Sequence, residues 1–232
     1  VTGGGAGIGG AISRLFAKHG ASVEIAEIDP ARGDEAVSEI VAAGGKARTH
    51  TVDVREEADV EGFKQAVLDE HGRVDVLVNN VGDYRPLAPF RKSSPETWDA
   101  MYQINFLHVV RVTHAFLDAM IESGGGSIVN IITASVFKGE AMLGAYIAAK
   151  GGVDALTRTG AAEDAGGGIR VNSVAPGGFA TPQIARYFRK FPEHKEKTIN
   201  QHAMRRIGQP REVAEPVIWL ASDRASFVTG IC

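Results

Sequence analysis

The feature that most constrains the fold of this chain is a regular alternation of short runs rich in Val and Ile with longer segments of helical character. Several of the short runs are almost continuously apolar, as strands covered by helices on both faces are. The expected strands are Ser22–Ala26, Ala47–Val52, Val74–Val78, Ser127–Ile132 and Ile169–Val174, and fragments of two more lie at the chain ends. Strands that alternate with helices build a parallel sheet, so the sequence predicts a doubly wound α/β fold.

Helical segments fill the intervals between these strands. Pro30, Pro95 and Pro210 each stand at an expected first helical position, where the missing N–H costs nothing. Glycine clusters at 124–126 and 166–168 follow expected helices, where glycine relieves a left-handed cap. The expected helices are Ile8–His19, Pro30–Ala43, Glu56–His71, Pro95–Glu122, Gly144–Ala165 and Pro210–Ser222.

No linker, repeat or low-complexity tract interrupts this pattern, and 232 residues with 44% hydrophobic positions are enough for one core. We therefore expect one domain spanning residues 1–232. In Ala180–Arg206, cationic residues and prolines alternate with aromatic ones. This segment follows a strand, at the edge where such sheets bind ligands, which favours a mobile substrate lid over a surface excursion without a role.

Both ends of the chain are expected to be truncated. Val1 stands at the end of what ought to be a strand, and Phe227–Cys232 stops where another strand begins.

Composition excludes several classes of partner. The formal net charge is −3 and its Lys and Arg residues are scattered, so no basic stripe is present for nucleic acid. Cys232 is the only cysteine and the seven histidines show no ligand spacing, so we expect neither a disulfide nor a metal site. No apolar run approaches the about 20 residues of a membrane span, and no signal segment opens the chain. We expect no membrane partner and a cytoplasmic location.

A glycine-rich turn connects the first strand fragment with the first helix. Its sequence, Thr2-Gly-Gly-Gly-Ala-Gly-Ile-Gly9, places Gly3, Gly7, Ile8 and Gly9 where backbone N–H groups can approach a pyrophosphate at a helix N-terminus. The spacing is Gly-x-x-x-Gly-x-Gly, one residue longer than the common dinucleotide fingerprint. Alone, such a turn is a weak signal.

Tyr146 and Lys150 stand four residues apart in an expected helix, so their side chains lie on one face. A free tyrosine has a pKa of about 10, and a tyrosine that exchanges protons near neutrality needs about 4 kcal/mol of preferential phenolate stabilisation. An adjacent ammonium can supply part of that stabilisation, so Lys150 is expected to lower the pKa of Tyr146.

These motifs resemble those of the short-chain dehydrogenase/reductase family. Thr133 stands 13 residues before Tyr146, the spacing at which the family carries its catalytic serine, and Asn105 matches the asparagine of the family's proton relay. The resemblance implies a catalytic set of Asn105, Thr133, Tyr146 and Lys150, with Tyr146 and Lys150 also touching the cofactor. The Thr133 hydroxyl is expected to contact the substrate oxygen together with Tyr146, and Ser135 is a rival for that contact.

The resemblance also assigns the cofactor side. Glu27 ends the second strand where an acid meets the adenosine ribose, and its charge would repel a 2′-phosphate. Ile28 follows where phosphate-binding relatives often carry Arg, so NAD is favoured over NADP. Further cofactor contacts are expected from Asp53, Val54, Asn80, Val81, Gly82, Pro176, Gly177, Phe179 and Thr181.

The family resemblance implies a Rossmann-type sheet of strand order 3-2-1-4-5-6-7 and a homotetramer. The expected reaction is hydride transfer between a secondary alcohol or ketone and a nicotinamide. Reduction of a 3-oxoacyl thioester with NADP(H) is the alternative within enzymes. A non-catalytic dinucleotide sensor is the alternative outside them, and such sensors usually lose the tyrosine or the lysine.

Overall fold

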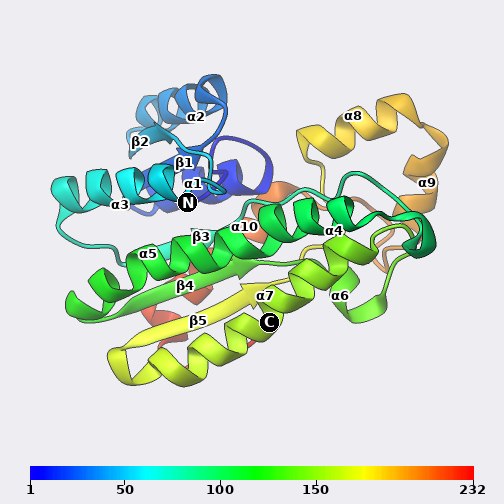
Figure 1. The fold of residues 1–232 in the computed structure, drawn as a ribbon. Helices are drawn as coiled ribbons and strands as arrows, with labels where there is room; N and C mark the ends of the chain where they lie inside the picture. The colour runs from blue at the N-terminus through cyan, green and yellow to red at the C-terminus, as the bar shows by residue number, and fades with distance from the viewer.

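The computed structural model describes residues 1–232, and its strands form parallel ladders flanked by helices (Figure 1). β1 (Ser22–Glu27) pairs with β2 (Lys46–Thr51). β4 (Gly126–Ile131) lies between β3 (Val76–Asn79) and β5 (Ile169–Val174). Each strand lies within two residues of its expected bounds.

Residues at both chain ends join these ladders into one order. The Thr2 N–H donates to the Val78 carbonyl at 3.0 Å, and the Gly3 N–H donates to the Ala26 carbonyl at 2.7 Å. At the other edge, the Ser173 N–H donates to the Ile231 carbonyl at 2.9 Å. The N-terminal residues therefore lie between β1 and β3, and the C-terminal residues flank β5. Counted with the residues at Thr2 as the first strand and those at Ile231 as the seventh, the observed succession is β2, β1, Thr2, β3, β4, β5 and Ile231. This succession is the expected order 3-2-1-4-5-6-7.

The long helices begin and end close to their expected positions. Pro30, Pro95 and Pro210 are the first residues of their helices, as their fixed φ favours. The helices around the sheet are α1 (Gly7–Lys18), α2 (Pro30–Ala42), α3 (Glu57–His71), α7 (Gly144–Asp164) and α10 (Pro210–Ala221). Short helical turns that were not expected are α6 (Ser135–Lys138) and 3₁₀ turns at Phe90–Lys92, Ala165–Gly167 and Asp223–Ala225.

The stretch Pro95–Glu122 is not the uniform helix that the sequence predicted. It divides into α4 (Pro95–Tyr102), a π-helical turn (Gln103–Leu107) and α5 (His108–Glu122). In length and composition the whole stretch would suffice to cross a membrane, contrary to our expectation, although core helices of soluble proteins meet the same criterion. Phe116 and Met120 of this stretch are buried in the main hydrophobic cluster, as the apolar residues of a core helix are.

The segment expected to be a lid contains two helices that the sequence did not predict. Thr181 caps α8 (Pro182–Lys190) by accepting a hydrogen bond from the Ile184 N–H, and α9 (Glu193–Asn200) follows. Neither helix contains a buried residue. Figure 1 shows both standing off from the sheet, beyond the ends of the strands.

The sheet separates two cores, which explains why its strands are apolar throughout. On one face, Leu77 and Ile128 pack with side chains of α3 and α5 such as Phe63 and Phe116. The next residues along the same strands, Val78 and Val129, belong to the cluster that includes α1 and α10. Because successive strand residues point to opposite faces, both sets must be apolar.

Candidate active site

The glycine loop lies at the carboxyl edge of the sheet and leads into α1. A β-carbon at Gly9 would lie 2.1 Å from the Gly3 carbonyl oxygen, so no other residue fits there. Gly3 and Gly7 adopt positive φ values of 61° and 58°. The N-cap residue Ala6 makes no side-chain hydrogen bond, and the first turn of α1 carries no acid. Its N–H groups are therefore free for an anionic group, which fits a pyrophosphate.

Glu27 ends β1 beside this loop, as expected. Its side chain is buried, and its carboxylate accepts hydrogen bonds from the Gly5 N–H at 3.1 Å and the Asp29 N–H at 3.3 Å. Ile28 next to it is 54% exposed. Arg32, a cation in the first turn of α2, is paired with Asp29 at 3.0 Å. The carboxylate therefore remains unneutralised by a side chain at the end of β1.

Two other expected cofactor residues are engaged by protein groups. The Asp53 carboxylate is paired with the Arg55 guanidinium, whose hydrogen bond lowers the pKa of Asp53. Val54 is buried. The Asn80 amide donates to the carbonyls of Thr2 at 3.0 Å and Gly3 at 3.3 Å. Asn80 thus holds the glycine loop in place from the end of β3.

Tyr146 lies in the first turn of α7, and the two candidate hydroxyl residues, Thr133 and Ser135, follow the carboxyl end of β4. Burial raises the pKa of the Tyr146 phenol to about 12, and a hydrogen bond with Thr133 opposes that shift. The Ser135 hydroxyl instead donates to Glu140 at 2.8 Å, while the Ser135 N–H donates to the Thr133 oxygen at 3.3 Å. The geometry therefore favours Thr133 as the hydroxyl that works with Tyr146.

Lys150 lies one helical turn from Tyr146 and is buried. Its ammonium donates to the carbonyls of Val81 at 3.1 Å and Ile131 at 2.9 Å. Burial lowers the pKa of Lys150 to about 7. Burial outweighs the other influences on the Tyr146 phenol and raises its pKa, whereas the sequence had predicted a lowering by Lys150.

Asn105 is fully buried in the π-helical turn and reaches the loop after β3. Its Oδ1 accepts from the Asp83 N–H at 3.1 Å, and its Nδ2 donates to the Asp83 carbonyl at 2.8 Å. Gly82 fits between Asn105 and Lys150: a β-carbon there would lie 2.8 Å from Asn105 Oδ1 and 3.1 Å from Lys150 Nζ. The loop thus brings these two side chains to one place.

The segment after β5 closes the same edge. The Pro176 carbonyl accepts from the Ala134 N–H at 3.0 Å, next to Thr133. Gly177 and Phe179 follow, and Phe179 forms a parallel bridge with Gly208. A β-carbon at Gly7 would lie 3.6 Å from Thr181 Cγ2, so Thr181 borders the glycine loop.

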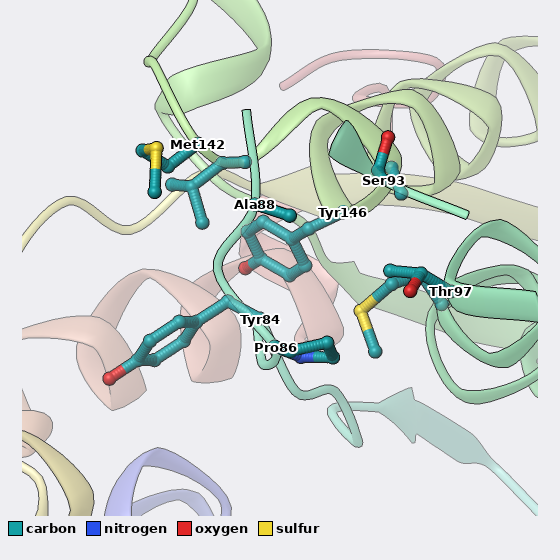
Figure 2. A pocket seen from close by; sticks show the side chains of 10 residues that line it. Tyr84, Pro86, Ala88, Ser93, Thr97, Met142 and Tyr146 are labelled. Carbon is teal, nitrogen blue, oxygen red and sulfur yellow. The ribbon is translucent and has the colours of Figure 1, made fainter. Parts of the chain in front are cut away.

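Several residues at this edge lie in segments that were expected to shape the pocket, but none of them was singled out individually from the sequence. The ring of Tyr84 packs edge-on against Tyr146, with centroids 6.4 Å apart, and Figure 2 shows them with Met142 around a small pocket. Gln183 Nε2 of α8 donates to Asp83 Oδ1 at 3.2 Å, and His202 Nε2 accepts from the Gly178 N–H at 2.9 Å. These contacts join segments up to 100 residues apart, so no local sequence signal could have indicated them.

Comparison with known proteins identifies the family. A family model described as enoyl-(acyl carrier protein) reductase matches residues 3–232. The chain belongs to the short-chain dehydrogenase/reductase family of oxidoreductases, as the resemblance of its motifs implied.

Among similar proteins are members that act on quite different substrates. The chain is 37% identical over 231 residues to a 3-oxoacyl-[acyl-carrier-protein] reductase of Thermotoga maritima, covering 99% of this chain and 92% of that protein. It is 38% identical over 232 residues to a cis-4-hydroxycyclohexanecarboxylate dehydrogenase of Sinomonas cyclohexanicum, covering 99% and 91%. A 7α-hydroxysteroid dehydrogenase solved with NADH and 7-oxo glycochenodeoxycholic acid is 31% identical, with a TM-score of 0.93 over 100% of this chain and 89% of that one.

Proposed function

We propose that this protein oxidises a secondary alcohol, or reduces the corresponding ketone, with NAD as the hydride carrier. The observation that carries this proposal is the meeting of four side chains at one edge of the sheet. Thr133 is the side chain whose hydrogen bonding opposes the rise of the Tyr146 pKa, and Gly82 fits between Asn105 and Lys150. These four residues come from three separate segments, and the Gly3–Gly9 loop lies at the same edge.

The residues along this edge fit a dinucleotide. The unpaired N–H groups at the start of α1 suit its pyrophosphate, and Glu27 suits the 2′-hydroxyl of an adenosine ribose rather than a phosphate. Lys150 would hold the other ribose, and the segment Pro176–Thr181 the carboxamide. When bound, the nicotinamide supplies the hydride donor or acceptor.

Tyr146 is the proton donor and acceptor in this proposal. With its pKa raised to about 12 by burial, the phenol is protonated at neutral pH and can donate to the oxygen of a ketone as that oxygen gains charge. Thr133 hydrogen-bonds the same oxygen and orients it. In the oxidation direction the phenol must first lose its proton, so we expect oxidation to accelerate as the pH rises above neutrality.

The part of the proposed substrate that carries the reacting hydroxyl is apolar. The small pocket beside Tyr146 is lined mainly by apolar and aromatic side chains, among them Tyr84, Pro86, Met142 and Leu143. Similar proteins include a cyclic alcohol dehydrogenase and a hydroxysteroid dehydrogenase, which supports a ring-bearing alcohol.

The test is a screen of cyclic secondary alcohols with NAD and NADP, followed by the absorbance of the reduced nicotinamide. Tyr146→Phe should abolish turnover and still bind NAD with wild-type affinity. Glu27→Gln keeps the acceptor oxygen for Gly5 but removes the charge, so it should weaken discrimination against NADP about tenfold. Wild-type turnover in Tyr146→Phe, or an unchanged cofactor ratio in Glu27→Gln, would contradict the respective assignment.

Reduction of a 3-oxoacyl thioester with NADP(H) is the second candidate, and the similar reductase of Thermotoga maritima favours it. The same four side chains would perform it, so the screen should include a 3-oxoacyl thioester with both reduced cofactors. A non-catalytic sensor would bind NAD without turning over either class.

Four other expectations from the sequence stay predictions. They are one domain over residues 1–232, a substrate lid at 180–206, a homotetramer and a cytoplasmic location.

A further inference from the structure

The lid segment Ala180–Arg206 carries a charge opposite to that of the chain as a whole. It contains seven Lys and Arg residues and two Glu residues, while the complete chain has a net charge of −3. Only Arg206 among these cations forms a salt bridge, with Glu212 in α10. The other six cations of the lid are Arg186, Arg189, Lys190, Lys195, Lys197 and Arg205, and all six are exposed.

One face of α8 is turned toward the candidate active site. Gln183 on this face donates to Asp83, the residue whose backbone binds Asn105. Tyr187, one turn further on, lies near Tyr84; burial raises the pKa of Tyr84, and Tyr187 adds to the effect. Tyr84 in turn packs on Tyr146.

Arg186 and Lys190 belong to that same face. Residues at positions i, i+3, i+4 and i+7 of a helix share one side, and Gln183, Arg186, Tyr187 and Lys190 have this spacing. The acid next to Gln183 is Asp83, which is already paired with Arg85. Arg186 and Lys190 are therefore two exposed cations without an ionic partner on the face of α8 that contacts Asp83, and the Lys190 ammonium lies 5.4 Å from the centroid of the Phe191 ring.

We propose that Arg186 and Lys190 bind an anionic group that the substrate carries away from its reacting hydroxyl, so that the preferred substrate is an alcohol or ketone bearing a carboxylate or phosphate. This inference rests on the proposed function and names the substrate class for it. The guanidinium of Arg186 can bind either anion with two parallel hydrogen bonds, and Lys190 adds a second charge.

The experiment compares anionic substrates with neutral partners that carry the same reacting group. One pair is cis-4-hydroxycyclohexanecarboxylate and its methyl ester. The other is the 3-oxobutanoyl thioester of coenzyme A, with its phosphates, and the neutral thioester of N-acetylcysteamine. We expect kcat/KM for at least one anion to exceed that of its neutral partner about tenfold or more, and the excess to shrink as salt is added. The pair that shows the excess tells carboxylate from phosphate.

Two double variants locate the effect. Arg186→Gln with Lys190→Gln should raise KM for the anionic substrate about tenfold and leave kcat/KM for the neutral partner within about twofold. Lys195→Gln with Lys197→Gln in α9 removes the same charge from the same lid and should change neither. The neutral substrate also reports whether each variant is folded.

Each outcome decides the proposal. Equal kcat/KM values within both pairs would overturn it while leaving the proposed function intact, because turnover would still be seen. An equal loss of anion preference in both double variants would overturn the assignment to Arg186 and Lys190. Absence of turnover with all four substrates, in a wild-type protein that binds NAD, would instead contradict the proposed function.

Discussion

The side-chain amide of Asn105 is bound in both directions by the backbone of Asp83, which donates to Oδ1 at 3.1 Å and accepts from Nδ2 at 2.8 Å. Nδ2 also donates to the Met101 carbonyl at 3.0 Å, one turn earlier in the helix. An asparagine side chain that takes a helical carbonyl competes with the main chain, which accounts for the π-helical turn at this point. Asn105 therefore links the helix to the loop that contacts Lys150.

Replacing Asn105 by Ala should cost stability as well as turnover. The variant leaves a partly buried donor and a partly buried acceptor of Asp83 without partners and opens a cavity at the buried Asn105, so we expect a loss of about 2–4 kcal/mol in the free energy of unfolding. Urea denaturation measures this loss. Gln103→Ala in the same turn is the control, since Gln103 is exposed and should change stability by less than about 0.5 kcal/mol. Equal losses in the two variants would refute the account.

Gly9→Ala should destabilise the protein and prevent dinucleotide binding. The added methyl group would lie 2.1 Å from the Gly3 carbonyl oxygen and 2.5 Å from Asn80 Nδ2, so the loop must shift. The matched control is Gly62→Ala in α3, where a β-carbon meets nothing within 4 Å. There we expect stabilisation by about 0.5–1 kcal/mol, because alanine favours a helix interior. Thermal unfolding of each variant, with and without NAD, tests these expectations. If NAD stabilised Gly9→Ala as much as it stabilises the wild type, the prediction for Gly9 would be wrong.

Lys150 makes stability depend on pH in the alkaline range. Burial lowers its pKa to about 7 in the folded protein, against the ordinary lysine pKa of 10.5, so between these values the unfolded chain binds a proton that the folded chain lacks. Stability must then rise with pH from about 7 toward 10.5. Between pH 7 and about 9.5 the free energy of unfolding should rise less steeply in Lys150→Met than in the wild type. The upper limit avoids the ionisation of unfolded tyrosines near pKa about 10. Parallel slopes in the two proteins would exclude a lowered pKa.

The carboxylate of Glu24 lies between two histidines, His50 Nε2 at 2.6 Å and His71 Nε2 at 2.8 Å. Burial alone would raise the pKa of Glu24, but the hydrogen bonds and charges of both histidines lower it below the usual 4.5. The folded state therefore gains stability above about pH 4.5 and loses it as the pH falls through the lowered pKa. In acid titrations followed by circular dichroism, Glu24→Gln should flatten this loss, whereas Glu35→Gln at an exposed position of α2 should not. A wild-type acid profile in Glu24→Gln would contradict the prediction.

The sequence by itself determined the strands and helices, and the family resemblance of its motifs supplied the order of the strands. Apolar runs and helix-start prolines are local signals, and helices such as α2 and α3 match their expected bounds within one residue because their caps are encoded within a few positions. The glycine loop could also be recognised from the sequence, because the positive φ values at Gly3 and Gly7 favour glycine in any surroundings. The spacing of Tyr146 and Lys150 in one helix was sufficient to place them on one face.

The tertiary structure alone decided how these residues are tuned. Lys150 was expected to lower the pKa of Tyr146, but burial raises the pKa of the phenol and lowers that of the ammonium, and burial depends on every segment packed around them. The π-helical turn and the contact of Gln183 with Asp83 depend on side chains that are distant in sequence. Local propensities carry no information about such contacts, because their free energy appears only when the segments are packed together.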